Sequence, residues 1–468
     1  MPSVFIKTYG CQMNERDSEA VAALLVGRGH TLAPSEQMAD VILLNTCSVR
    51  DLAEQKAIGK MQKLLSVARK QKTGQKFGIL GCMAQSRGAE LIDQLPGLDL
   101  VVGTQKFHHT ADHIEAILAG TARRVVDTDA EAGSQNAIRD HLVLADSMAR
   151  PGSLPPNSVP TQVKAFVSIM QGCNQHCTFC IVPQTRGGER SRPIPEVVAE
   201  CRALVDRGVK EVTLLGQIVT SYGKRDYPIR DGRSAFVQLI EAVHELDGLE
   251  RIRFTSPHPK GYGPDLVAAY ARLPKLVENA HLPVQSGSNR LLQLMHRGYT
   301  RERYLEIIAQ LRAARPGIAL STDFIVGFPG EADADFEETL SLARTIEFDM
   351  AYVFKYSPRR DTPAAVLPEQ LPKEVIEERH RRLLDVVNET GLAKYHTFVG
   401  RTVQILVEGL SRKNAARYEG RTRCNKIVVF DGNERHHGQL LDVRIERVGT
   451  FTLYGDPAII GMNESLTA

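Results

Sequence analysis

Eight cysteines are the residues of this 468-residue chain whose spacing points most directly to chemistry. Three of them lie close together in Cys173-Asn-Gln-His-Cys177-Thr-Phe-Cys180. Three thiolates on one short loop can bind three irons of a [4Fe–4S] cluster and leave the fourth iron open to another ligand. A structural zinc site would need a fourth local ligand, but no fourth cysteine is near, and we expect the ring of His176 to point away. The spacing therefore favours an iron–sulfur cluster.

Three further cysteines each come directly after a short apolar run: Cys11, Cys47 and Cys82. Such runs are typical of strands buried in a parallel sheet, and ligands bind at the edge formed by the carboxyl ends of those strands. We therefore expect the three thiols to converge on one rim. A buried structural cysteine is the alternative for each thiol taken alone, but three equivalent positions favour a shared metal site.

The elements that would position these three thiols alternate between strand-like and helix-like patterns over residues 1–130. Strands are predicted at residues 4–9, 41–44, 77–80 and 98–102, and helices at residues 18–26 and 52–68. This alternation predicts an open parallel α/β sheet with helices on both faces. Residues 131–161 lose the periodicity and collect Gly, Ser, Pro and Asn, so we expect a linker there, although its segment HLVLAD has the composition of a short strand.

A second alternation over residues 162–395 would position the Cys173 loop. Strands are predicted at residues 165–170, 211–215, 251–255, 281–284, 319–326 and 350–356, and helices at residues 195–207, 235–246 and 302–314. Six such units predict a partial (β/α)6 barrel with its chemistry at the carboxyl-terminal rim. Periodicity leaves a doubly wound sheet open as the alternative fold.

Residues 396–468 follow a polar helix predicted at residues 373–390 and consist of short strands at residues 402–407, 427–430, 440–445, 451–454 and 458–460. They predict a small β-barrel, a shape often used to bind oligonucleotides. The basic stretch of this region carries six cations and a single acid, Glu419; the cations are Arg412, Lys413, Arg417, Arg421, Arg423 and Lys426. We expect it to contact phosphates, whereas a lone charge run is more often a solvated loop.

The composition excludes several classes of protein. Apolar residues make up 43% and charged residues 24% of the chain, which is typical of globular domains. The net charge of +3 does not by itself indicate a nucleic-acid binder. No apolar run approaches the roughly 18 residues of a membrane span, and the first residues do not resemble a signal peptide, so a cytoplasmic location is expected. No P-loop and no strand-linked dinucleotide-binding motif occurs.

The spacing of the remaining cysteines and of the histidines predicts no metal or catalytic site. Cys201 lies on a predicted helix and is expected to be a core thiol, and Cys424 has no assigned role. No histidine forms an HExxH-type zinc motif, so the histidines are expected on the surface; they are His108, His109, His113, His380, His436 and His437.

The C-x3-C-x2-C spacing after an early barrel strand, with Phe179 before the last cysteine, resembles the signature of radical S-adenosylmethionine enzymes. In that family the open iron chelates the amino and carboxylate groups of S-adenosylmethionine. One-electron reduction then cleaves this cofactor to a 5′-deoxyadenosyl radical. The resemblance implies that Cys173, Cys177 and Cys180 hold the radical-generating [4Fe–4S] cluster.

Over nearly its whole length the chain resembles the methylthiotransferases, most closely those of MiaB type that act on tRNA. The matching stretches are Thr8-Tyr-Gly-Cys-Gln-Met-Asn14, Asn45-Thr-Cys-Ser-Val-Arg50, Gly81-Cys-Met-Ala-Gln85, Gln171-Gly-Cys-Asn174, Thr185-Arg-Gly-Gly-Glu-Arg-Ser-Arg-Pro193, His281-Leu-Pro-Val-Gln-Ser-Gly-Ser288 and Asp323-Phe-Ile-Val-Gly-Phe-Pro-Gly-Glu331. The last domain resembles the TRAM RNA-binding domain, including Gly420-Arg-Thr-Arg-Cys-Asn425.

This resemblance implies that Cys11, Cys47 and Cys82 bind an auxiliary iron–sulfur cluster of [4Fe–4S] type, which carries the sulfur. One S-adenosylmethionine methylates that sulfur and a second supplies the radical, which removes hydrogen from C2 of N6-isopentenyladenosine beside the anticodon of tRNA. Acid–base groups could not remove this unactivated hydrogen. The alternative substrate is threonylcarbamoyladenosine in tRNA or an aspartate of a ribosomal protein. The basic stretch argues against the ribosomal protein as substrate.

By the same analogy, Gln217, Ser256 and Gln285 at the strand ends and Arg297 are expected to contact S-adenosylmethionine. The alternative is that Gln285 caps a turn and that Arg297 is a solvated helix charge. The implied partners are the tRNA anticodon stem-loop, a reductant such as flavodoxin or ferredoxin, and a sulfur or cluster donor. We expect no membrane association and a monomer. A two-cluster electron carrier, or a non-enzymatic RNA-binding module, is the alternative class of function.

Overall fold

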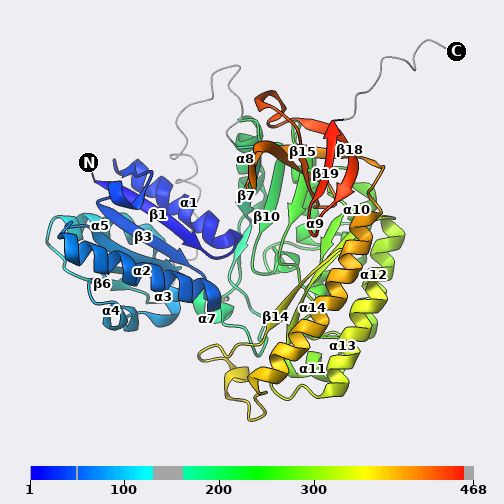
Figure 1. Cartoon of the computed structure of the whole chain (residues 1–468), viewed down its shortest axis with the longest axis horizontal. Coiled ribbons are helices and arrows are strands. Elements are labelled where there is room, and N and C mark those ends of the chain that lie inside the picture. The colour runs from blue at the N-terminus through cyan, green and yellow to red at the C-terminus, as the bar shows by residue number, and fades with distance from the viewer. Residues whose placement is uncertain (1, 49–50, 130–161, 458–468) are drawn as a thin grey trace.

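The computed structural model describes residues 2–48, 51–129 and 162–457 (Figure 1). Its amino-terminal region is a six-stranded parallel sheet of order β2-β1-β3-β4-β5-β6. The strands are β1 (Ser3–Tyr9), β2 (Thr31–Leu32), β3 (Val41–Thr46), β4 (Lys76–Gly81), β5 (Leu100–Val102) and β6 (Val125–Asp127). The predicted open sheet is confirmed. The short edge strands β2 and β6 were missed because two or three residues cannot show a periodic pattern.

Helices cover both faces of this sheet, so its central strands are apolar on both sides. Ile42 and Leu44 of β3 pack towards α2 (Asp51–Gln71), α3 (Cys82–Arg87) and α4 (Glu90–Gln94). Val41 and Leu43 pack towards α1 (Gln12–Gly27) and α5 (Thr110–Leu118). Alternate side chains of one strand thus fill two hydrophobic cores.

The central region is a partial barrel of six parallel strands in chain order. The strands are β7 (Lys164–Ser168), β10 (Glu211–Leu215), β11 (Arg251–Phe254), β12 (Asn279–His281), β13 (Ala319–Val326) and β14 (Met350–Lys355). They form the sheets β11-β10-β7 and β12-β13-β14, joined by one parallel bridge between Ile252 and Leu276. This sequential order excludes the doubly wound alternative, whose order would reverse at a switch point, and confirms the (β/α)6 prediction.

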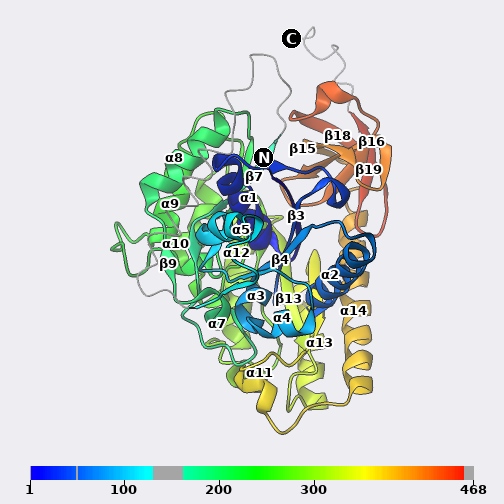
Figure 2. The same cartoon turned by 90° about the vertical axis from the view of Figure 1, so that its left-hand side faces the viewer.

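Helices surround the outside of the barrel (Figure 2). They include α8 (Ile194–Val205), α9 (Ala235–His244), α10 (Pro264–Arg272), α12 (Arg301–Ala314), α13 (Asp333–Ile346) and α14 (Lys373–His396). Alternate strand residues such as Val212, Ile252 and Leu320 face these helices and form the largest hydrophobic core. The residues between them line the barrel interior, among them Thr213, Arg253, His281, Ser321, Asp323, Tyr352 and Phe354.

The last region is a closed five-stranded barrel of order β15-β16-β17-β19-β18. Its strands are β15 (Thr402–Ser411), β16 (Asn414–Thr422), β17 (Ile427–Phe430), β18 (Leu440–Val448) and β19 (Leu453–Pro457). The small β-barrel is confirmed, but β16 was missed because its polar residues show no apolar alternation. The strand predicted at residues 458–460 and the linker at 131–161 lie outside the described residues.

No helix among the described residues is long and apolar enough to span a membrane.

Candidate active site

The three amino-terminal cysteines follow three neighbouring strands. β1, β3 and β4 are adjacent in the sheet, and their last residues Tyr9, Thr46 and Gly81 lie opposite one another. Cys11 precedes the first turn of α1, Cys47 follows β3, and Cys82 begins α3. The Cys47 amide donates a hydrogen bond to the Tyr9 carbonyl at 2.9 Å, which ties the first two strand ends together. The structure therefore brings these thiols to one rim, as predicted.

A buried amide network supports this rim from below. Asn14 and Asn45 are fully buried, and the Asn14 Nδ2 donates to Asn45 Oδ1 at 3.2 Å. Asn45 Nδ2 in turn donates to the Asn14 carbonyl at 2.9 Å and to Ser18 Oγ at 3.0 Å. The Cys11 amide donates to Asn14 Oδ1 at 3.4 Å. The network fixes the first turn of α1 against β3, and with it the position of Cys11.

An arginine from the central region completes the amino-terminal site. Arg186 Nε donates to Cys82 Sγ at 3.3 Å, and its Nη2 pairs with Asp17 Oδ2 at 2.6 Å. Both partners of this ion pair are almost fully buried. Burial alone would lower the pKa of Arg186, but Asp17 and the thiol of Cys82 outweigh burial and raise it. A permanent positive charge is therefore held against the thiols.

The thiols of this site differ in acidity. A hydrogen bond with Cys47 is the largest influence on Cys11 and, helped by the charge of Arg186 against the effect of burial, lowers its pKa to about 6. Burial raises the pKa of Cys82, although Arg186 opposes that rise. Arg359, from the loop after β14, lies close enough to Cys47 for the two charges to interact, although burial lowers its pKa. Metals bind thiolates, so the ionised Cys11 suits a ligand role.

The central cysteines lie on one loop at the carboxyl end of the first barrel strands. The loop begins at Gly172, where φ is +79° and a Cβ atom would lie 2.0 Å from the Gly188 carbonyl oxygen, so no side chain fits. The Cys173 amide donates to the Gly187 carbonyl at 3.0 Å, and the Cys180 amide donates to the Cys177 carbonyl at 3.0 Å. Thr178 Oγ1 donates to the Leu294 carbonyl at 2.9 Å, which holds the middle of the loop against the opposite wall.

Arg297 faces this central loop. Its Nη1 donates to Cys177 Sγ at 3.3 Å and its Nη2 to the Pro283 carbonyl at 3.1 Å. The side chain is buried, so the alternative of a solvated helix charge is wrong. Burial opposes the charge, but Tyr299 and Cys177 raise the pKa of Arg297. Burial also raises the pKa of Cys173 to about 11 and that of Cys180 to about 12.

The other predicted S-adenosylmethionine contacts lie near this loop at the strand ends. Gln217, just after β10, accepts a 2.6 Å hydrogen bond from the Gly172 amide. Ser256 and Gln285 follow β11 and β12 with φ of +55° and +75°. Such φ values are strained for residues with side chains and cluster at functional sites. Gln285 is also tied to β13 by backbone hydrogen bonds to Asp323 and Ile325, so its turn is fixed.

Helix α7 (Val182–Arg186) joins the two sites, because it starts just after Cys180 and ends at the arginine that touches Cys82. It packs against α3, which begins at Cys82 (Figure 1). The two cysteine triplets are therefore neighbours in space, with α7 between them.

The donor sets fit iron–sulfur clusters better than mononuclear zinc. Zn–S bonds of about 2.3 Å in a tetrahedron place sulfurs roughly 3.8 Å apart. Among the described residues, the only three potential ligands whose ligand atoms all lie within 4.8 Å of one another are His109, His113 and Asp127. Both cysteine triplets are thus spread more widely than a single zinc ion requires, and each has a buried arginine that offsets thiolate charge.

Three family models match the chain in succession. Residues 3–103 match uncharacterized protein family UPF0004, residues 167–343 match the Radical SAM superfamily, and residues 396–458 match the TRAM domain. The tRNA-2-methylthio-N(6)-dimethylallyladenosine synthase of Opitutus terrae is 53% identical over 475 residues, which cover 99% of this chain and 98% of that protein. The chain belongs to this synthase family. The synthase of Akkermansia muciniphila is 50% identical and covers 98% of this chain and 99% of its own.

A solved structure supports the fold of this family member. The radical S-adenosylmethionine methyltransferase TsrM from Kitasatospora setae aligns with a TM-score of 0.55 and 13% identity, covering 78% of this chain and 77% of its own. At that identity the likeness concerns the fold alone.

Two of the six cations in the basic stretch of this synthase-family chain, Arg423 and Lys426, dock the small barrel on the central region, whereas Arg421 pairs within the barrel itself. Arg421 pairs with Glu408 at 3.1 Å, Arg423 with Glu278 at 2.7 Å, and Lys426 with Asp349 at 2.6 Å. Arg253 donates to the carbonyls of Thr422 and Arg423 at 2.8 and 3.0 Å. The predicted phosphate contact is therefore wrong for Lys426, which is buried in its ion pair. For Arg421 and Arg423, which are partly exposed, and for Arg412 and Lys413, which are exposed, it stays a prediction.

A histidine–aspartate cluster also corrects the sequence-based view. His109 Nδ1 and His113 Nε2 both lie 2.8 Å from Asp127 Oδ2, and Lys106 Nζ lies 3.8 Å from Asp127 Oδ1. Burial opposes ionisation of this carboxyl, but His113 and His109 outweigh it and lower the pKa of Asp127. These histidines thus share one carboxylate oxygen of Asp127, which ties α5 and the turn before it to the edge strand β6.

The remaining residues of interest lie away from the chemistry. Cys201 is fully buried in the barrel core, as predicted, and Cys424 Sγ lies 3.1 Å from Thr422 Oγ1.

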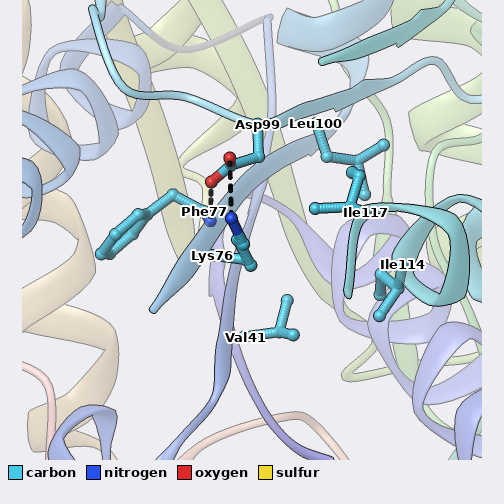
Figure 3. Close-up of a pocket in the computed structure, with 7 residues that line it drawn as sticks. All are labelled: Val41, Lys76, Phe77, Asp99, Leu100, Ile114 and Ile117. Carbon is cyan, nitrogen blue, oxygen red and sulfur yellow. Dashed lines mark hydrogen bonds and ion pairs between the residues drawn. The ribbon is translucent and has the colours of Figure 1, made fainter. Parts of the chain in front are cut away.

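Figure 3 shows a small, mostly apolar pocket at the amino ends of β3, β4 and β5, opposite the cysteine rim; it is lined by Val41, Lys76, Phe77, Asp99, Leu100, Ile114 and Ile117.

Proposed function

We propose that this chain transfers a methylthio group to C2 of N6-isopentenyladenosine beside the anticodon of tRNA. The observation that carries the proposal is the joining of two cysteine triplets by α7, so that Arg186 touches Cys82 only a few residues after Cys180. An enzyme with a single radical cluster would need no second set of thiols beside it. The names of the relatives that span the whole chain favour isopentenyladenosine over the alternative substrates.

We assign one cluster to each triplet. Cys173, Cys177 and Cys180 hold the radical [4Fe–4S] cluster, and Cys11, Cys47 and Cys82 hold the auxiliary cluster of [4Fe–4S] type. With S-adenosylmethionine bound, the radical cluster supplies one-electron cleavage to a 5′-deoxyadenosyl radical, which suits an unactivated C–H bond.

Residues of the chain orient these groups. Arg297 and Arg186 each place a buried guanidinium against one cysteine sulfur, and Asp17 fixes Arg186. Gln217, Ser256 and Gln285, on strand ends next to the Cys173 loop, together with Arg297 contact S-adenosylmethionine in this proposal. In this proposal, Arg297 supplies the guanidinium that pairs with the carboxylate of S-adenosylmethionine.

The proposed organisation follows from these assignments. Residues 1–130 form the sulfur-carrying domain, residues 131–161 the linker, residues 162–395 the radical domain, and residues 396–468 the TRAM RNA-binding domain. The substrate partner is the anticodon stem-loop of tRNA, and a reductant such as flavodoxin or ferredoxin and a sulfur or cluster donor serve the two clusters. We place this monomer in the cytoplasm.

Mass spectrometry of nucleosides tests the activity. Anaerobically reconstituted protein is incubated with a reductant, S-adenosylmethionine and tRNA that carries N6-isopentenyladenosine. Formation of 2-methylthio-N6-isopentenyladenosine together with 5′-deoxyadenosine supports the proposal. Formation of 5′-deoxyadenosine without a methylthio nucleoside would mean that this radical enzyme acts on another substrate, and the same assay on threonylcarbamoyl tRNA is the matched control.

A further inference from the structure

Two aromatic side chains on the last barrel strand have no role in the cysteine sites. Tyr352 and Phe354 of β14 are 50% and 39% exposed, which is unusual for large rings on a central strand. Their rings lie nearly parallel, with centroids 6.5 Å apart and planes at 21°. They present adjacent aromatic surface to solvent.

This aromatic pair faces the barrel interior. The intervening residues Ala351 and Val353 pack against the outer hydrophobic core, and His380 of α14 contacts the Val353 carbonyl at 3.0 Å. Because side chains alternate along a strand, Tyr352 and Phe354 point the other way. The Tyr352 ring lies 6.4 Å from the ring of His281 on β12, across the inner face of β13.

The polar groups beside the pair suit the edge of a planar ligand. Asp323 is the register partner of Tyr352, and its Oδ2 lies 3.6 Å from His281 Nε2. His281 Nδ1 lies 3.0 Å from Ser321 Oγ. A flat aromatic surface flanked by hydrogen-bonding groups is the arrangement that proteins use to bind an unstacked nucleobase.

The segment that follows the aromatic pair leads to both cysteine triplets. Tyr356 is buried in the small cluster against which Phe179, the neighbour of Cys180, packs. Arg359 interacts electrostatically with Cys47. The strand that carries Tyr352 and Phe354 therefore leads directly into a segment that lies near both sites.

We propose that Tyr352 and Phe354 form the stacking surface for the target adenine of the tRNA, extruded from its loop into the barrel interior. This inference rests on the proposed function, because it takes the base that reacts as the occupant. Bases must leave their stack before an enzyme can reach their ring atoms, and a sequence-tolerant aromatic platform holds them afterwards.

A binding cycle tests the stacking surface independently of catalysis. The reconstituted wild type and the Y352A/F354A variant are each titrated with tRNA that carries the target adenine and with tRNA that is abasic at that position. Loss of stacking weakens binding by about tenfold. We expect the wild type to lose this factor when the base is removed, and the variant to bind both RNAs equally. An equal loss in variant and wild type would overturn the proposal.

Turnover supplies the second measurement. Y352A and F354A should lower kcat/KM for tRNA by about tenfold and raise the amount of 5′-deoxyadenosine formed per methylthio product, whereas Y352F should remain close to wild type because its ring is kept. The matched control is Leu32→Ala at an exposed position of β2. Alanine variants with unchanged kcat/KM and an unchanged amount of 5′-deoxyadenosine per methylthio product would contradict the inference. If the wild type forms no methylthio product, the proposed function fails, and the binding cycle still decides the stacking surface.

Discussion

The two cysteine triplets provide the same number of thiols by opposite means. The three thiols of the central triplet lie within eight residues of one loop, which Gly172 begins and which Thr178 and Arg297 tie to the opposite wall. The amino-terminal triplet is assembled from three strand ends and needs Arg186 from the central region. A local loop tolerates change elsewhere, whereas an assembled site depends on sheet register and on how the two regions dock.

The largest effect should come from removing one triplet at a time. Replacing Cys11, Cys47 and Cys82 by alanine should abolish methylthio transfer and remove about one cluster's iron, while S-adenosylmethionine is still cleaved. Replacing Cys177 alone should abolish the cleavage. Iron and sulfide analysis together with 5′-deoxyadenosine yield measures both. If the triple variant also loses cleavage, the two sites are not separable as the structure indicates.

Breaking the ion pair between the two regions should be the next largest effect. R186M leaves the carboxylate of Asp17 buried without its partner, which costs about 3–5 kcal/mol. Urea unfolding of the cluster-free protein measures this loss. The double variant R186M/D17N should recover much of it, because it removes the isolated charge. A single variant as stable as wild type would show that docking does not depend on this pair.

Removing one supporting hydrogen-bonding side chain at each site should lower the free energy of unfolding by smaller amounts, and by more at the amino-terminal site than at the central loop. N45A leaves the buried amide of Asn14 and the hydroxyl of Ser18 short of partners and should cost about 1–3 kcal/mol. T178V removes a single hydrogen bond to the Leu294 carbonyl and should cost about 0.5–1.5 kcal/mol. Chemical denaturation of both variants gives the comparison, and the reverse order would indicate that the loop, not the rim, is the less tolerant site.

The smallest effect concerns the pH dependence of thiol reactivity in the cluster-free protein. Thiolates are the nucleophiles, and Cys11, with a pKa of about 6, should be alkylated at full rate at neutral pH and more slowly as the pH falls through that value. Cys173 and Cys180 have pKa values of about 11 and about 12, so their alkylation rates should keep increasing as the pH rises through the alkaline range. Peptide mass spectrometry measures each rate, with buried Cys201 as the unreactive control. Identical profiles would contradict the difference.

The difference between the triplets also explains what the sequence could predict. Spacing within Cys173 to Cys180 and the apolar strands before Cys11, Cys47 and Cys82 indicated both sites, because local patterns fix a loop and a strand end. Arg186 and Asp17 were not assigned a role, because their contact joins residues far apart in the chain. The docking role of Arg423 was likewise invisible, since a cation's partner in another domain leaves no trace in spacing.

The strands that were missed have a similar explanation. β6 is too short to show a period, yet it brings Asp127 to His109 and His113. β16 is polar on its exposed face, so its place in the closed barrel is set by pairing with β15 and β17. Tertiary pairing decided both cases.

The attachment of the small β-barrel sets a distance requirement for any RNA that uses both ends of the molecule. Its contacts with Lys164, Arg251 and Asp349 lie at the amino-terminal ends of the barrel strands, whereas the cysteine loop lies at their carboxyl ends. The first and last of the eight residues of β13 are separated by seven steps of about 3.3 Å, or roughly 23 Å. An RNA held at the small barrel can deliver a base to the clusters only from a point that far along its own length. Under the proposed function, this spacing would select a nucleotide by its position in the RNA as well as by its chemistry.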